Sequence, residues 1–229
     1  MNLLIVDNNI NPDSWGAPDL VKYARLATGA TIHVRRAPAE DLPENPRAFD
    51  RIILSGSKTS ALADAPWITR LLEFVRRSLD EGKPLLGVCY GHQMLARLLA
   101  GEDSVGKSQM AEIGWTKIEV THPSPLFTGL PTQFYSFSSH YEEVKKLPPG
   151  CRALARSEAC GIQAMQVGDK PVFGIQFHPE RDAAQADERF RKAKSERTRP
   201  EFVLGEGKSG KLFDPKVGET IFRNFLSLR

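Results

Sequence analysis

The sequence has few cysteines, no long apolar run and no strong excess of charge of either sign. Its three cysteines are an odd number without paired spacing, which argues against a disulfide framework. No apolar run is long enough to cross a membrane, and the first is soon interrupted by polar residues at 7–9, so no signal peptide is expected. We therefore expect a cytoplasmic protein with free thiols and no membrane partner.

The charge balance also excludes classes of function. The chain carries 31 basic and 28 acidic residues, a net charge of +3, with no dense basic stripe beside stacking aromatics, so we expect no nucleic-acid partner. The five histidines show no paired ligand spacing and no CxxC occurs, so we expect neither a metal site nor a cofactor. The hydrophobic and charged fractions, 41% and 26%, are typical of a globular protein, and 229 residues fit one domain over 1–229.

The order of apolar segments predicts an α/β fold. Strands are expected at 3–7, 31–35, 51–54 and 85–88, and helices at 18–27, 66–80 and after residue 89. Such alternation predicts a mostly parallel central sheet with helices on both faces. From about Val105 the pattern changes to short strands at 118–121, 134–138, 153–157, 162–167 and 172–177. The last two form an expected hairpin, so an antiparallel portion joins the sheet, and a helix over 217–228 closes the fold.

A cysteine lies where the 85–88 strand meets the following helix. Gly87 and Gly91 stand two residues either side of Cys89, where a side chain would crowd a sharp turn. This is the plan of a nucleophile elbow, and it places the thiol at a helix N-terminus, where the dipole favours a thiolate. Cys89 is therefore the expected nucleophile, whereas Cys151 and Cys160 are expected to be structural thiols.

A second segment supplies a base for this thiol. The strand over 172–177 ends in His178-Pro179-Glu180, and residues i and i+2 of an extended chain point to the same side. Glu180 can thus orient one imidazole nitrogen of His178 while the other faces the sulfur. The chain then holds a nucleophile, a base and an orienting carboxylate.

These motifs resemble those of the class I glutamine amidotransferases, also called the triad glutaminases. The family pattern G-x-C-x-G-x-Q is met by Gly87, Cys89, Gly91 and Gln93, and its F-H-P-E segment by residues 177–180. Three further segments match in family order, at 3–8, 53–56 and 139–148. The resemblance covers roughly residues 1–180 and implies the flavodoxin-like fold of this family. Its motifs are closest to those of the glutaminase of GMP synthase.

The resemblance implies hydrolysis of the side-chain amide of glutamine, or of a related γ-glutamyl amide. Cys89 forms a thioester, His178 protonates the departing ammonia, and water then releases glutamate. The backbone of Tyr90 supplies one oxyanion donor by the elbow geometry, and the family draws another from the loop at Gly56 and Ser57. Because 229 residues barely exceed the glutaminase fold, a synthase or acceptor partner is expected on a separate chain.

Other residues are expected to bind substrate. Gln93, one helical turn after Cys89, faces either the pocket or solvent. The family contacts the amino-acid end of its substrate through the segment that is Ser138, Ser139 and His140 here, followed by Tyr141 and Glu142 in place of Gly and Asp. Glu142 either receives the substrate ammonium or is solvated. His92 is expected to be structural.

Two departures from the family leave alternatives open. The 55–60 loop reads Ser-Gly-Ser-Lys-Thr-Ser instead of containing G-G-P, and its Lys58 is either solvated or reaches a substrate carboxylate. Residues 181–216 form a charged insertion, either a lid or docking surface or a solvated excursion, too polar to build core. The alternatives to a glutaminase are a stand-alone γ-glutamyl peptidase or hydrolase and a non-catalytic regulator or sensor.

Overall fold

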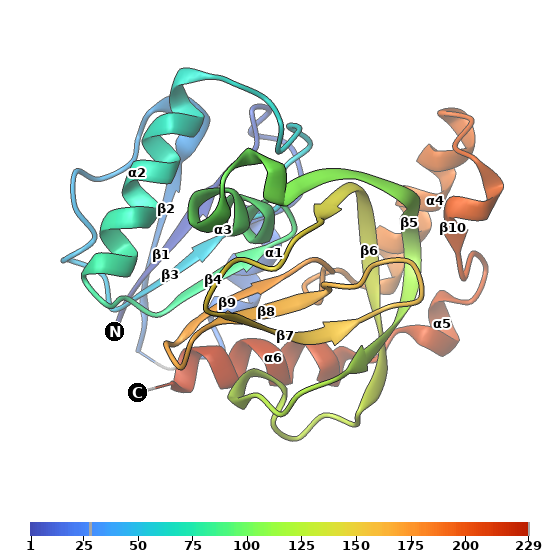
Figure 1. Ribbon diagram of the computed structural model, residues 1–229. Coiled ribbons are helices and arrows are strands. Elements are labelled where there is room, and N and C mark those ends of the chain that lie inside the picture. Colours follow the sequence, from blue (N-terminus) through green and yellow to red (C-terminus); the bar gives the residue numbers. More distant parts are fainter. Residues whose placement is uncertain (28, 229) are drawn as a thin grey trace.

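The computed structural model describes residues 1–27 and 29–228, which build a ten-stranded sheet with helices on both faces (Figure 1). Thr28 and Arg229, which fall within the expected domain 1–229, lie outside the described residues. Five strands of the sheet are parallel, in the order β2-β1-β3-β4-β9. Their bounds are β1 Asn2–Asp7, β2 Thr31–Arg36, β3 Arg51–Leu54, β4 Leu85–Val88 and β9 Val172–Ile175. The predicted α/β class, with a mostly parallel central sheet, is confirmed.

Alternating apolar residues bury both faces of this parallel half. In β1, Leu3 and Ile5 join one core cluster, and Leu4 and Val6 join the other, because successive side chains of a strand point to opposite faces. Two helices contribute to each cluster. The first cluster includes α1 (Ala17–Ala24) and α6 (Pro215–Ser227), and the second includes α2 (Pro66–Asp80) and α3 (Tyr90–Ala100). Within the described part of the chain, no helix is long and apolar enough to cross a membrane.

The antiparallel portion is built on two strands much longer than expected. They are β5 (Val105–Val120) and β6 (Gln133–Val144), which pair with each other, and they are followed by β7 (Cys151–Arg156) and β8 (Ala164–Val167). The sequence predicted only 118–121 and 134–138, because residues 106–110 of β5 are mostly exposed and show no apolar alternation. The expected hairpin of β8 and β9 is confirmed as an antiparallel pair. Short 3-10 helices cover Ala37–Ala39, Glu102–Ser104, Pro125–Phe127 and Pro200–Phe202.

The charged segment after Glu180 packs against the β5–β6 end of the sheet (Figure 1). It contains α4 (Ala183–Ser195), β10 (Val203–Leu204), which pairs with β5, and α5 (Ser209–Leu212). Phe190 and Ala186 of α4 form a third apolar cluster with Trp115 and Phe137. The expectation that this segment is too polar to build core is therefore wrong, because a few apolar residues at helical spacing are enough to bury one face of α4.

The third cluster predicts the effect of one substitution on stability. Phe190 is 3% exposed, so Phe190→Ala removes a buried aromatic side chain and should cost about 3 kcal/mol of unfolding free energy. Urea denaturation followed by circular dichroism measures this loss. Arg191→Ala, at an exposed position of the same helix, is the matched control and should change stability by less than about 0.5 kcal/mol. Equal stability of the two variants would show that α4 adds no core.

Candidate active site

Cys89 stands at the turn between β4 and α3 in a backbone conformation that side chains rarely adopt, with φ at 50°. Two glycines allow the helix to approach the sheet here. A Cβ atom on Gly87 would lie 2.5 Å from the carbonyl carbon of Gly91, and one on Gly91 would lie 2.7 Å from Cβ of Leu54. The elbow expected from the sequence is therefore present, and both glycines are required by close contacts.

His178 and Glu180 form a buried pair beside the cysteine. Nδ1 of His178 lies 2.7 Å from Oε1 of Glu180, and both residues are at most 1% exposed. The backbone N–H of His178 donates to the carbonyl of Phe137 at 2.6 Å, which ties this segment to β6. A Cβ atom on Gly56 would lie 2.9 Å from Cε1 of His178 and 3.5 Å from Cβ of Cys89, so the fold brings the imidazole, the thiol-bearing residue and the 55–60 loop together.

The electrostatics of this pair favour an imidazolium. Burial lowers the pKa of His178, but the Glu180 carboxylate and the Cys89 sulfur raise it more, so that it reaches about 9. Nε2 of His178 is buried and has no hydrogen-bond partner among the described residues. This nitrogen is available to exchange a proton with a reacting group.

Polar side chains near the end of β1 hold the 55–60 loop in place of the missing glycine and proline. Asn8 donates through Nδ2 to the carbonyl of Ser55 at 2.8 Å, and Asn9 donates to that of Gly56 at 3.2 Å. Ser57 donates its hydroxyl proton to the carbonyl of Asn8 at 2.8 Å. Gly56 and Ser57 thus have a fixed backbone next to Cys89. Tyr90, the first residue of α3, has a buried ring close to Trp67.

A cavity of about 300 Å³ opens onto Cys89. Of the residues predicted to bind substrate, Gln93, Ser139 and His140 line it, but Ser138 does not, because its side chain is fully buried. The exposed-helix alternative for Gln93 is wrong, since this residue is only 4% exposed. The other lining residues are Trp15, Ser57, Lys58, Thr59, Ser60, Tyr141, Glu142, Arg189, Lys192 and Glu196.

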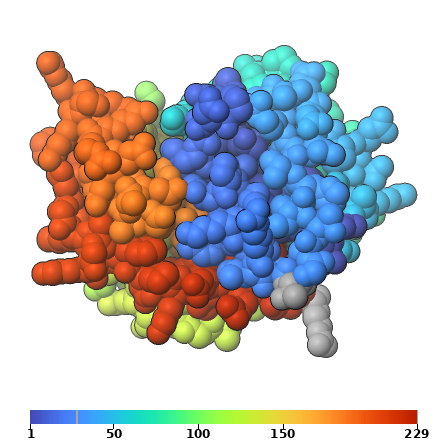
Figure 2. All heavy atoms as spheres, turned by 180° about the vertical axis from the view of Figure 1, so that it is seen from behind, coloured from blue at the N-terminus to red at the C-terminus, as the bar shows by residue number. Residues whose placement is uncertain are grey.

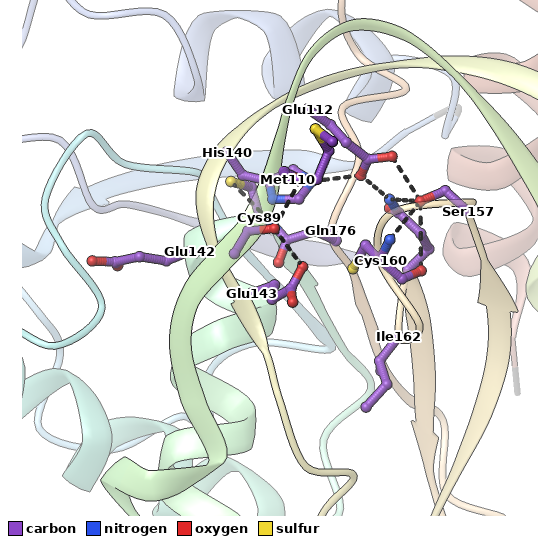
Figure 3. A network of polar contacts seen from close by, with 12 residues as sticks. Cys89, Met110, Glu112, His140, Glu142, Glu143, Ser157, Cys160, Ile162 and Gln176 are labelled. Carbon is purple, nitrogen blue, oxygen red and sulfur yellow. Dashed lines mark hydrogen bonds and ion pairs between the residues drawn. The ribbon is translucent and has the colours of Figure 1, made fainter. Parts of the chain in front are cut away.

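Glu142 follows neither of its two expected roles. Its carboxylate accepts a hydrogen bond from Oγ of Ser60 at 2.5 Å and another from the backbone N–H of Ala61 at 2.7 Å. Figure 3 shows it well away from the main network of polar contacts. Glu142 therefore braces the 55–60 loop.

His140 is held from behind by a buried carboxylate. Its Nε2 lies 2.9 Å from Oε2 of Glu112, which also accepts from the side-chain amide of Gln163 at 2.6 Å. Ser157 donates to the second oxygen of Glu112 at 2.7 Å (Figure 3). This network fixes the ring of His140 at the cavity, and no sequence motif indicated Glu112.

Sequence reasoning also missed Gln176, which contacts the cysteine directly. Its side-chain amide nitrogen lies 3.5 Å from Sγ of Cys89, and its oxygen accepts from the amide of Gln93 at 3.1 Å (Figure 3 labels Gln176 beside Cys89). Gln93 donates as well to the carbonyl of Glu142 at 2.7 Å. The only signal in the sequence was a polar residue inside the apolar 172–177 segment.

Trp15 covers the imidazole on the side of the N-terminal segment. Its ring packs edge-to-face on His178 with centroids 4.6 Å apart, and the guanidinium of Arg181 lies 3.8 Å from the indole centroid. Arg181 is 3.6 Å from Asp19, to which Gln185 of α4 also donates at 2.7 Å. Seen from behind, α4 accordingly lies beside the N-terminal region (Figure 2). A tryptophan in a loop without periodicity gave no signal.

The remaining histidine and cysteine predictions concern structural roles. Burial lowers the pKa of His92 to about 3, and this neutral ring contacts the carbonyl of Ile162 at 3.2 Å, as expected for a structural residue. Cys160 is fully buried and Cys151 half-buried, and both thiols are free. Across residues 1–27 and 29–228, no group of three or more potential ligands is placed to hold a metal ion.

The parallel sheet and this site together define the protein as an enzyme of the cysteine hydrolase class. The family model for glutamine amidotransferase class-I matches residues 19–195, and the chain belongs to this family. One of the two subunits named for glutamine-hydrolyzing GMP synthase in Methanocaldococcus jannaschii is 37% identical over 160 residues, which are 70% of this chain and 78% of that protein. The same-named protein from Pyrococcus abyssi is 44% identical over 109 residues, 47% of this chain and 57% of that protein.

Solved structures share the whole fold. A glutamine amidotransferase from Methylobacillus flagellatus aligns with a TM-score of 0.82 and 24% identity, over 98% of this chain and 94% of its own. Another from Thermotoga maritima aligns with a TM-score of 0.78 and 20% identity, over 99% and 98% of the two chains. At these identities the likeness establishes the flavodoxin-like fold of the family.

The His178–Glu180 contact predicts a titration. In the wild-type protein His178 should keep its proton up to a pH of about 9, because the carboxylate stabilises the imidazolium. Glu180→Gln removes that negative charge, so the pKa of His178 should fall well below 9. NMR titration of ¹⁵N-labelled histidine measures both values, and His92 in the same spectra should stay neutral above pH 5. An unchanged pKa for His178 would contradict the role of Glu180.

Proposed function

We propose that this chain hydrolyses the side-chain amide of glutamine through a thioester on Cys89. Membership of the class I glutamine amidotransferases supports the reaction. The observation that carries the assignment of residues is the packing of Gly56 against both His178 and Cys89, beside the buried His178–Glu180 pair. The comparisons do not favour a stand-alone γ-glutamyl peptidase or a non-catalytic regulator.

In this mechanism the Cys89 thiolate attacks the amide carbonyl, and a tetrahedral oxyanion forms. The backbone N–H groups of Tyr90 and the Gly56–Ser57 segment stabilise the negative charge. His178 donates its proton to the nitrogen, the C–N bond breaks, and ammonia leaves a thioester behind. Water then gives a proton to His178 and attacks the thioester, which releases glutamate and restores the thiolate. Glu180 keeps the imidazole oriented throughout.

Gln93, Ser139 and His140 are the proposed contacts for the amino-acid end of the substrate. All three line the cavity that contains Cys89. Ser138 is left out of this proposal because its side chain is buried away from the cavity. The whole chain is proposed as one amidotransferase-type domain, with 181–216 as an insertion and with a reducing compartment, such as the cytoplasm, as its setting.

The nucleophile assignment predicts selective labelling. A chloroketone analogue of glutamine should add one label per chain at Cys89, and Cys89→Ser should abolish both this label and ammonia release from glutamine. Mass spectrometry and an ammonia assay measure the two effects. Cys151→Ser is the matched control, because Cys151 is half-buried and outside the cavity, and it should keep both. Labelling that persists in Cys89→Ser would overturn the assignment.

We propose further that the ammonia serves a separate synthase chain. The relatives are named as one subunit of GMP synthase, which supports this place for the reaction. The synthase chain of the same source should form GMP from added ammonium salt alone. With glutamine as nitrogen source it should form GMP when this chain is present and should not when Cys89→Ala replaces it. GMP formation measured by chromatography tests this, and a synthase chain that gains nothing from glutamine would refute the pairing.

A further inference from the structure

Three cations from two separate segments line one cavity with Cys89. Lys58 belongs to the loop after β3, whereas Arg189 and Lys192 belong to α4, in the proposed insertion. We call these three residues the cationic wall. The reaction steps proposed above use none of them, since attack, proton transfer and oxyanion binding all involve other groups.

Arg189 is the best-positioned member of the cationic wall. Its side chain is only 11% exposed, its Nε donates to Oγ of Ser139 at 3.2 Å, and its Nη1 lies 3.3 Å from Oε2 of Glu196. Within the described residues its Nη2 has no hydrogen-bond partner. A guanidinium presents a planar set of donors that matches a carboxylate, so one pre-oriented arginine beside a cavity suits an anionic ligand group.

The helix that carries Arg189 is held firmly on both sides. Asp182 caps α4 through a hydrogen bond from the N–H of Gln185 at 3.0 Å, and Phe190 packs in the third apolar cluster. The side chain of Gln185 also donates to Asp19 of α1 at 2.7 Å. Arg189 therefore holds its donors in place before a ligand arrives, which reduces the entropy lost on binding.

The two lysines leave positive charge at the cavity that the protein only partly balances. Lys192 is 3.6 Å from Glu196, but Lys58 forms no ion pair with a carboxylate among the described residues. Burial lowers the pKa of Lys58, and the neighbouring Lys192 lowers it further, as expected for two like charges held close together. Glu142, the acidic residue that lines the cavity on the loop side, is occupied by Ser60 and Ala61.

We propose that Arg189, assisted by Lys58 and Lys192, binds the α-carboxylate of the amino-acid substrate. This inference rests on the proposed function, because it assigns a substrate contact to that same site. It makes the segment after Glu180 a wall of the substrate pocket. The carboxylate lies four bonds from the amide carbon of glutamine, so Cys89 and the cationic wall recognise opposite ends of one small molecule.

Comparing two substrates tests this role. Glutamine and its α-methyl ester each carry one side-chain amide, but only glutamine carries the carboxylate. Arg189→Met should raise KM for glutamine by roughly 10- to 100-fold, the range for losing a charged hydrogen-bonded contact, with kcat within about twofold. For the methyl ester, kcat/KM should stay within about twofold of the wild-type value. Arg189→Lys should restore part of the preference for glutamine.

Two sets of controls separate a binding role from damage to the fold. Arg191→Met, on the exposed side of α4, should leave both substrates unaffected. Lys58→Met combined with Lys192→Met changes exposed side chains only, and should raise KM for glutamine alone, by less than Arg189→Met does. Equal losses on both substrates in either cationic-wall variant, or an unchanged KM for glutamine, would overturn the inference.

The same assays distinguish this inference from the proposed function. A wild-type protein that releases no ammonia from glutamine and takes no chloroketone label would refute the function, and the inference with it. A wild-type protein that hydrolyses glutamine through Cys89, but whose cationic-wall variants show no preference change, would refute the carboxylate site alone.

Discussion

The close approach of α3 to the sheet is the constraint on which the site depends. It requires glycine at positions 87 and 91, and it forces Cys89 into a left-handed backbone conformation that costs on the order of 1–3 kcal/mol. Backbone hydrogen bonds hold this conformation, from the N–H of Cys89 to the carbonyl of Ile175 at 2.7 Å and from that of Gln93 to the carbonyl of Cys89 at 3.0 Å. The first of these bonds also fixes where β9 passes, and so which residues of that strand lie near the thiol.

The register of β9 then determines the second half of the site. Gly87 pairs with Gly174 and Val88 with Ile175, so the next residues of the chain, Gln176 to His178, follow beside the cysteine. The antiparallel half of the sheet holds this extension through Phe137, whose carbonyl binds the N–H of His178. The parallel half thus positions the nucleophile and the antiparallel half positions the base. Neither half is a site without the other.

The sequence predicted the parts of this arrangement that depend on local chemistry. Paired glycines around a cysteine and a His-x-Glu segment carry their geometry within a few residues, and both appear as expected. Gln176, Trp15 and Arg189 act through contacts with residues distant in the chain, so no local pattern marked them. The length of β5 was underestimated for a related reason, because its exposed residues pair with β6 without an apolar face to bury.

The order of strands in the sheet has a consequence for the chain while it is being synthesised. β4 pairs with β3 on one side, but its other neighbour, β9, is translated only after both long antiparallel strands. Until residues 172–175 leave the ribosome, Leu85–Val88 form an apolar strand with an open edge, which is a template for association with other chains. A nascent chain stopped before that point has a thiol without a base. Protection from aggregation and catalytic competence therefore arise in the same step, when β9 takes its place beside β4.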